Sequence, residues 1–275
     1  MPVRCKIRFP WVILLVLMQP LAAALAQPVN INCIADLLCV EVYRERQIKL
    51  VLENKTDKPL SFALFLQPDD LHRFNPDTLR LSQPMTKVLT LFPRPKSAWR
   101  YEYRIHYGHE RHEHDDDYLY TLPYARGSTY PITQSHVNIS THHLGNLYAI
   151  DWDMPRGAAV HAARDGVVVS TYRLSANNSL TGEATANHIW IQHPDGTIGK
   201  YLHLDYDGVL VAEGQSIHAG ERIGVAGNTG FSSGSHLHFS VSTLGGDSLY
   251  QTFNVKFKTR SGPRNLVSGQ EYLHP

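Results

Sequence analysis

The sequence has no excess of charge of either sign and no long hydrophobic run beyond its first 26 residues. Its 275 residues include 26 Lys and Arg against 25 Asp and Glu, a formal net charge of +1. A nucleic-acid binder needs a basic excess to neutralise phosphates, so we expect no nucleic acid among the partners. No later stretch approaches the ~20 apolar residues that cross a bilayer, so we expect no membrane span in the mature protein.

Cysteine is scarce, with three in the whole chain. Cys5 lies in a segment that we expect to be removed, which leaves Cys33 and Cys39 as an even pair. The two could close a small loop if the chain turns between them, or they could remain buried thiols. We favour a disulfide, because both thiols would otherwise meet an oxidising compartment.

The first 26 residues have the layout of a secretory signal peptide. Three basic residues, Arg4, Lys6 and Arg8, precede an apolar run over 11–18, and small residues end in Ala-Leu-Ala. This order predicts a signal peptide over 1–26, followed by cleavage. We therefore expect an exported protein that works in the periplasm or outside the cell.

Short β runs separated by turn residues occupy residues 27–117. Four of these runs alternate or are continuously apolar: 48–53, 60–66, 88–92 and 99–105. Their spacing predicts a β-sandwich-like N-terminal domain over 27–117. Four His and three Asp near its end, between positions 106 and 117, look like metal ligands, but their polar surroundings favour a solvated linker.

From residue 118 onward, Gly-bounded β runs follow one another, and no run of ten or more residues has helical periodicity. Asp195-Gly196 between two runs predicts a hairpin, since both turn positions tolerate positive φ. We therefore expect an all-β protein whose second domain, 118–275, is compact and mostly antiparallel. Eleven of the 16 His lie at or after residue 136, so its chemistry should lie here.

Histidines on the predicted strands of this domain share one face. His236 and His238 are two residues apart, and alternate side chains of a strand point the same way. An H-x-H pair alone is as often two surface His, but the Gly- and Ser-rich segment leading into this strand favours a metal site. On another strand, alternation places Leu202 and Leu204 in the core, and His203 with Tyr201 on the opposite face.

A third cluster combines His142 and His143 with Asp151. The carboxylate of Asp151 lies in an apolar run, where burial is costly unless the group is paired or bound to a metal. A salt-bridged or capping Asp is the alternative.

Several motifs follow one another along this part of the chain: His142…Asp151, Pro155-Arg-Gly157, Val160–Val167, Tyr201-Leu-His203-Leu204, Gly227-Asn-Thr-Gly230 and His236-Leu-His238-Phe239. In this order, they resemble the motifs of the lysostaphin-type (LytM-like) zinc metallopeptidases. The resemblance covers roughly residues 118–241, and the lead-in at Tyr120–Tyr124 and Gln134 is similar to the exported bacterial murein endopeptidases of that family.

The resemblance implies one Zn²⁺ per chain, held by His142, Asp151 and His238. It also implies that His203 and His236 are catalytic residues that do not bind the metal. Two imidazoles and one carboxylate leave a fourth zinc position for water, which the metal makes more acidic. The sequence has no H-E-x-x-H glutamate, so the two further His are expected to move protons and stabilise the oxyanion.

The spacing of the first two ligands differs from the best-known members of the family. Eight residues separate His142 from Asp151, a longer interval that the exported branch shares. Counting eight residues on from Gln134, as that branch does, selects His142, and His143 remains the alternative.

The implied function is a zinc-dependent endopeptidase that hydrolyses peptide cross-links in bacterial peptidoglycan, with the peptide stems as its partners. One alternative is a catalytically inactive relative that acts as a binding regulator of cell-wall amidases, although all five implied positions are retained. Another is a zinc-free β-sandwich adhesin or chaperone whose His are incidental. The sequence identifies no envelope protein that regulates it.

Overall fold

The computed structural model describes most of the chain from Pro28 to its end. The described residues are 28, 30–34, 38–44, 47–55, 60–67, 79–81, 87–93, 100–107, 111–135, 146–180, 185–244 and 250–275. The predicted signal peptide, His142 and His143 lie outside them. These described ranges contain no helix and therefore no helix of the length and hydropathy needed to cross a membrane.

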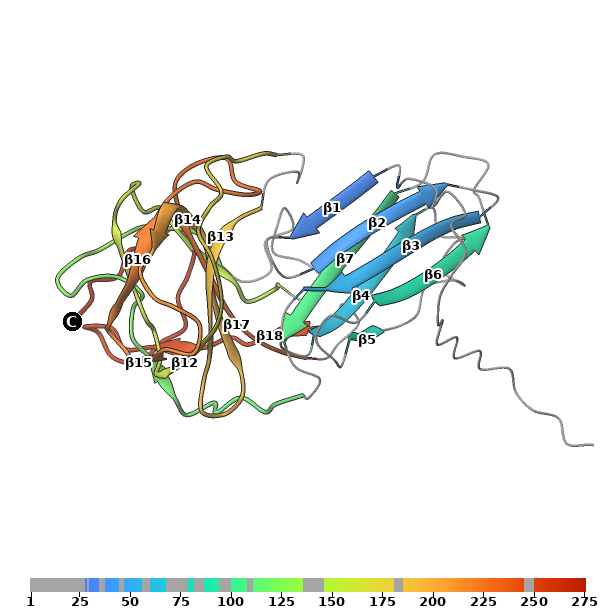
Figure 1. Ribbon diagram of the computed structural model, residues 1–275. Coiled ribbons are helices and arrows are strands. Elements are labelled where there is room, and N and C mark those ends of the chain that lie inside the picture. The colour runs from blue at the N-terminus through green and yellow to red at the C-terminus, as the bar shows by residue number, and fades with distance from the viewer. Residues whose placement is uncertain are drawn as a thin grey trace, which may run out of the picture.

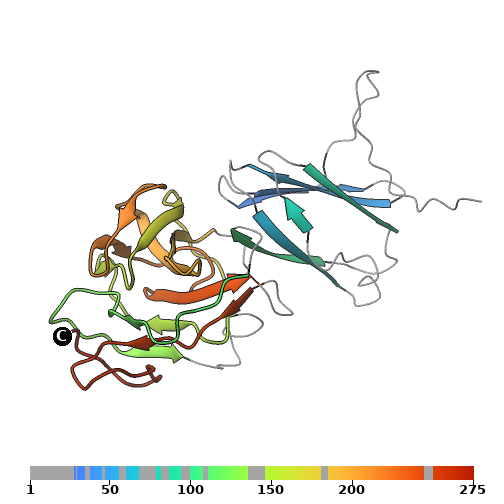
Figure 2. The same ribbon diagram turned by 90° about the horizontal axis from the view of Figure 1, so that it is seen from below.

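The first strands form two antiparallel sheets. One sheet has the order β1-β2-β3-β6 and contains β1 (Asn30–Ile34), β2 (Leu38–Arg44), β3 (Gln47–Asn54) and β6 (Lys87–Pro93). The other has the order β5-β4-β7 and contains β4 (Leu60–Gln67), β5 (Leu79–Leu81) and β7 (Arg100–Tyr107). Figure 2 shows the sheets as separate layers, so the predicted β-sandwich is confirmed. The four predicted strands correspond to β3, β4, β6 and β7.

The β1–β2 pair explains how two cysteines close in sequence can meet. Cys39 is disulfide-bonded. Because the two strands run antiparallel, the residue directly opposite Cys39 is Cys33. This register gives the close backbone approach that the predicted disulfide needs.

The later strands centre on a ten-stranded, mostly antiparallel sheet. They are β8 (Leu119–Tyr120), β9 (Ile132–Ser135), β10 (Ile150–Trp152), β11 (Ala159–His161), β12 (Gly166–Tyr172), β13 (Asn187–Gln192), β14 (Ile198–Val209), β15 (Ser216–Ile217), β16 (Arg222–Ala226), β17 (Leu237–Leu244), β18 (Tyr250–Thr252) and β19 (Lys256–Phe257). The main path is β15-β12-β13-β14-β17-β10-β9, with β11, β16 and β18 paired to its members and β8 pairing separately with β19. In Figure 1 these strands form a second group beside β1–β7, with β18 drawn nearest to that first group. The predicted hairpin at Asp195-Gly196 joins β13 to β14, and Gly196 takes a φ of 82°.

Buried aromatic side chains pack on one face of this sheet. Trp152, Phe239 and Phe257 have ring centroids 5.9–6.3 Å apart, and Tyr201 lies 5.0 Å from Phe239. Each such side chain contributes roughly 1.5–3 kcal/mol through burial. Because side chains alternate along a strand, this core fixes which residues of β10, β14 and β17 face the other way.

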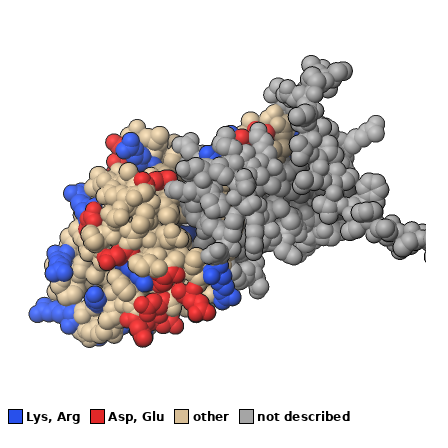
Figure 3. Space-filling view, turned by 60° about the horizontal axis from the view of Figure 1, so that its bottom comes forward, with Lys and Arg blue, Asp and Glu red and all other residues tan. Residues whose placement is uncertain are grey.

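Figure 3 shows one face of the molecule. On that face, basic and acidic side chains of the described residues lie near one another. No continuous basic stripe crosses the part of this face that the structure describes.

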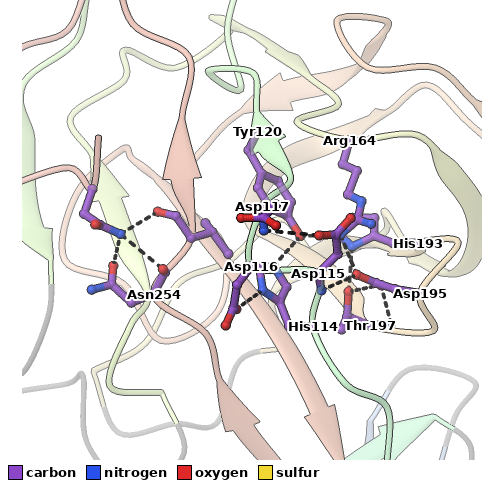
Figure 4. Close-up of polar contacts among 12 residues, drawn as sticks. His114, Asp115, Asp116, Asp117, Tyr120, Arg164, His193, Asp195, Thr197 and Asn254 are labelled. Carbon is purple, nitrogen blue, oxygen red and sulfur yellow. Dashed lines mark hydrogen bonds and ion pairs between the residues drawn. The ribbon is translucent and has the colours of Figure 1, made fainter. Parts of the chain in front are cut away.

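The segment before β8 packs against later parts of the chain and is not a solvated linker at His114. The His114 side chain is only 3% exposed, and its ring stacks 4.8 Å from that of Phe253. Its Nδ1 donates to Asp116 at 2.8 Å, and its Nε2 accepts from the Tyr120 hydroxyl at 3.1 Å. The linker prediction is therefore wrong for this residue, which stacks on Phe253 from a distant part of the chain and lies beside Asp116 and Tyr120 (Figure 4).

The same cluster contains a buried ion pair between Arg164 and Asp195. Arg164 donates to Asp195 Oδ2 at 2.6 Å and to the Tyr120 hydroxyl at 3.0 Å (Figure 4). Burial alone would raise the pKa of Asp195, but hydrogen bonds from Thr197 and Asp115, together with the Arg164 charge, lower it to about 2. The carboxylate is therefore held in its charged form.

We expect Asp195→Asn to weaken the acid dependence of stability. The folded pKa lies below the ordinary value of 3.8, so the carboxylate stabilises the fold above about pH 4, and this contribution is lost as pH falls toward 2. The difference in unfolding free energy between wild type and variant, measured by denaturant titration, should shrink over that interval. The exposed Asp117→Asn variant is the control, and a difference that does not change with pH would contradict the role of Asp195.

Candidate active site

Two predicted metal ligands face each other on neighbouring strands. Asp151 of β10 lies directly opposite His238 of β17 in the strand register. Asp151 Oδ1 and His238 Nδ1 are 2.8 Å apart, and the two residues are 3% and 8% exposed. Trp152 and Phe239, the next residues along each strand, point into the aromatic core and so direct this pair to the opposite face.

A bulge in β14 brings His203 to that face. Tyr201 is in the core, whereas Leu202 lines the same cavity as His238. Strict alternation would then return His203 to the core, but its φ of 63° breaks the alternation and its side chain also lines the cavity. His203 therefore lies away from the core, as alternation from Leu204 predicts, whereas the predicted core position of Leu202 and the predicted placement of Tyr201 beside His203 are wrong.

The environment of His203 defines which ring nitrogen is protonated. Its Nδ1 lies 2.7 Å from the Thr229 carbonyl oxygen, which can only accept, so Nδ1–H is the donor and Nε2 is an acceptor. Burial, with smaller effects from His236 and His238, lowers the pKa of His203 to about 3. The ring is therefore neutral at physiological pH.

His236 lies beside His203 at the more open side of the site. The two ring centroids are 4.5 Å apart, and the His203 ring is 5.9 Å from that of His238. His236 Nδ1 donates to the Gly234 carbonyl at 2.8 Å, and the Ser232 hydroxyl lies 3.2 Å from the same nitrogen. The Gly- and Ser-rich segment thus orients this imidazole.

These side chains line a cavity of about 330 Å³. Its lining residues are Gln134, Asn146, Asp151, Leu180, Leu202, His203, Phe231, Ser232, Ser233, His236 and His238. Sequence reasoning missed Asn146, whose Nδ2 lies 3.3 Å from His238 Nε2. Its position between the predicted ligands was the available signal. The predicted Asp151, His203, His236 and His238 are therefore brought together.

The Asp151–His238 pair fits a zinc ion as part of a larger donor set. Carboxylate oxygen and imidazole nitrogen are zinc ligands in sites that keep an open position. Two such atoms on one tetrahedral ion lie about 3.3 Å apart, somewhat more than the 2.8 Å of this hydrogen bond. Within the described ranges, no group of three His, Cys, Asp or Glu side chains is arranged to hold a metal. The third predicted ligand, His142, and its alternative His143 lie outside those ranges.

The sequence profile of Peptidase family M23 matches residues 145–249. The matched segment contains Asp151, His203, His236 and His238, and all four line the cavity. Residues 145–249 are therefore similar to Peptidase family M23.

Two curated relatives of the chain carry different functional names. The chain is 40% identical over 95 residues to the peptidoglycan DD-endopeptidase ShyA from Vibrio cholerae, covering 34% of this chain and 20% of ShyA. It is 38% identical over 97 residues to the murein hydrolase activator NlpD from Salmonella dublin, covering 35% of this chain and 23% of NlpD. The match therefore spans about a fifth of the length of either relative.

The chain is also similar to lysostaphin from Staphylococcus simulans. That solved structure is 28% identical, with 45% of this chain and 47% of lysostaphin covered and a TM-score of 0.36.

Proposed function

We propose that this protein is a zinc-dependent endopeptidase that hydrolyses peptide cross-links in bacterial peptidoglycan. The observation that carries the proposal is the convergence on one cavity of Asp151, His238, His203 and His236, all from the segment similar to Peptidase family M23. The name of ShyA, a peptidoglycan DD-endopeptidase, supports the substrate class. The peptide stems of peptidoglycan are the proposed partners.

We assign zinc binding to Asp151, His238 and the undescribed His142. The ion would supply Lewis-acid polarisation of the scissile carbonyl and a more acidic water. The contact between Asp151 and His238 supports this assignment, because a cation can replace the proton that the two groups share.

His203 is the proposed proton acceptor. Its Nδ1–H is occupied by the Thr229 carbonyl, so Nε2 is the nitrogen that can take a proton from the attacking water. The proton can then pass to the amine that leaves when the peptide bond breaks. His236, 4.5 Å away, is placed to hydrogen-bond to the oxygen on which negative charge develops.

Export and domain organisation belong to the same proposal. The basic, apolar and small segments of 1–26 support export to the periplasm or the cell exterior, where peptidoglycan lies. We assign 27–117 to an N-terminal β-rich domain and 118–275 to the peptidase domain. The His112 amide donates to the Thr243 hydroxyl of β17 at 2.8 Å, so the last residues before this boundary also contact the large sheet.

The alternative is a catalytically inactive regulator of cell-wall amidases. It is supported by the similarity to NlpD, whose name is that of an activator. Against it stands the retention of Asp151, His203, His236 and His238 in one cavity. Bound zinc and turnover would separate the two functions.

Digestion of purified sacculi tests the proposed function directly. The mature protein should release cleaved muropeptides, identified by mass spectrometry, and a chelator should stop the release until zinc is added back. His218→Ala, a substitution of an exposed His outside the cavity, is the matched control and should digest at the wild-type rate. Zinc-loaded protein that released no product but activated a purified amidase would favour the regulator.

A further inference from the structure

We propose that Asn187 and Thr229 are positioning residues for His203. Together they hold the bulge that turns its imidazole into the cavity, and they fix the proton on its Nδ1. The proposal rests on the proposed function for what His203 does, and on hydrogen bonds for how His203 is held. Neither Asn187 nor Thr229 lines the cavity, so each would act through His203.

The bulge makes His203 an extra residue in β14. Leu202 lies opposite His188 of β13, and Leu204 lies opposite Asn187, the residue that directly precedes His188. Two residues therefore advance along β14 for one along β13, and His203 is the additional one. Its φ of 63° is unfavourable for a residue with a Cβ and persists only where the surroundings hold it.

Asn187 holds the backbone that follows His203. The residue is fully buried, and its Nδ2 lies 2.9 Å from the Asp205 carbonyl and 3.3 Å from the Leu204 carbonyl. The same side chain bonds both backbone groups of Ser175, with Nδ2 donating to the carbonyl at 2.8 Å and Oδ1 accepting from the amide at 2.9 Å. One amide group thus ties the end of the bulge to a neighbouring loop.

Thr229 contacts both the bulge and the imidazole. Its hydroxyl accepts from the backbone N–H of Asn187 at 2.9 Å and donates to the Leu204 carbonyl at 2.8 Å. Its own carbonyl accepts from His203 Nδ1 at 2.7 Å. The hydroxyl therefore locates the carbonyl that selects the protonated nitrogen of His203.

The position of Thr229 is itself constrained by the next residue. Gly230 has a φ of 78°, and a Cβ there would meet Ala186 at 2.5 Å. The Gly230 amide donates to the Asn177 carbonyl at 3.0 Å, and its carbonyl accepts from the Ser179 amide at 2.9 Å. The loop thus has little freedom to compensate for a lost Thr229 hydroxyl.

Thr229→Val in the full mature protein tests the proposal, because it removes the hydroxyl at nearly constant shape and keeps the carbonyl. With cross-linked muropeptide dimers as substrate, kcat should fall ~10–100-fold, the scale of a small misplacement of a reacting group, while KM and zinc content stay unchanged. Nitrogen-15 NMR of zinc-loaded protein should show that His203 no longer keeps its proton solely on Nδ1. Thr229→Ser restores the hydroxyl and should restore both kcat and the NMR signature.

Thr259→Val is the matched control. Thr259 is also buried, and its hydroxyl donates to the Gly262 carbonyl at 2.7 Å, but it lies outside the cavity. This variant should lose stability without any change in kcat or in the His203 signature. Should Thr229→Val fail to fold, Thr229→Ala removes the same hydroxyl with a smaller side chain and gives the same test.

A Thr229→Val protein with wild-type kcat and an unchanged His203 tautomer would overturn the proposal. A fall in kcat that Thr259→Val reproduces would also overturn it, since the loss would then follow stability. The NMR readout needs no turnover. If the wild type proves inactive, a tautomer change in Thr229→Val alone still supports the positioning role, and the failure is confined to the proposed function.

Discussion

Zinc content should fall to background in Asp151→Ala and in His238→Ala, and sacculus digestion should be lost with it. The two side chains are proposed as two of three protein ligands, and their donor atoms already lie 2.8 Å apart. Loss of a supporting hydrogen-bond partner alone costs ~10–100-fold in metal affinity, so loss of a ligand should cost more. Elemental analysis after dialysis against buffer without metal measures the occupancy.

The control for this experiment is His218→Ala, which removes an exposed imidazole outside the cavity. It should keep one zinc per chain and full activity. Full zinc occupancy in either Asp151→Ala or His238→Ala would show that the ligand assignment is wrong. The same zinc analysis of His142→Ala and His143→Ala then decides which of the two histidines is the third ligand, since only the variant that lacks the ligand should lose its zinc.

The sequence predicted those parts of the fold that depend on local pattern. Short alternating or continuously apolar runs located β3, β4, β6 and β7, because runs of this length between turn residues are typical of strands. Asp195-Gly196 located a hairpin, because the turn needs residues that tolerate positive φ. The H-x-H spacing also placed His236 and His238 in one cavity.

The positions of individual side chains depend on contacts that a pattern does not contain. Regular alternation along β14 predicts Leu202 in the core, whereas the bulge at His203 inverts the alternation. That bulge is held by Asn187 and Thr229, which come from other segments. The prediction of a solvated linker fails at His114 for the same reason. Its neighbours in sequence are polar, whereas its stacking partner Phe253 comes from a distant part of the chain.

His203→Ala should keep its zinc and its fold while losing ~10²–10⁴-fold in activity, the usual contribution of one positioned acid-base group. The His203 imidazole hydrogen-bonds to the Thr229 carbonyl, whereas the proposed ligands Asp151 and His238 contact each other. Removal of the His203 imidazole therefore leaves the proposed ligands in place. Circular dichroism, zinc analysis and the rate of muropeptide release measure the three properties. His203→Asn serves as a companion variant, because Asn adopts positive φ more readily than Ala and so preserves the bulge.

The contrast with His238→Ala separates catalysis from metal binding, since that variant should lose both zinc and activity. Loss of zinc in His203→Ala would make His203 a ligand, and near wild-type digestion would leave His236 as the proton acceptor. The His203→Ala variant also tests how Thr229 acts. If Thr229 works through His203, adding Thr229→Val to His203→Ala should cost nothing more in kcat, because the group it positions is already gone.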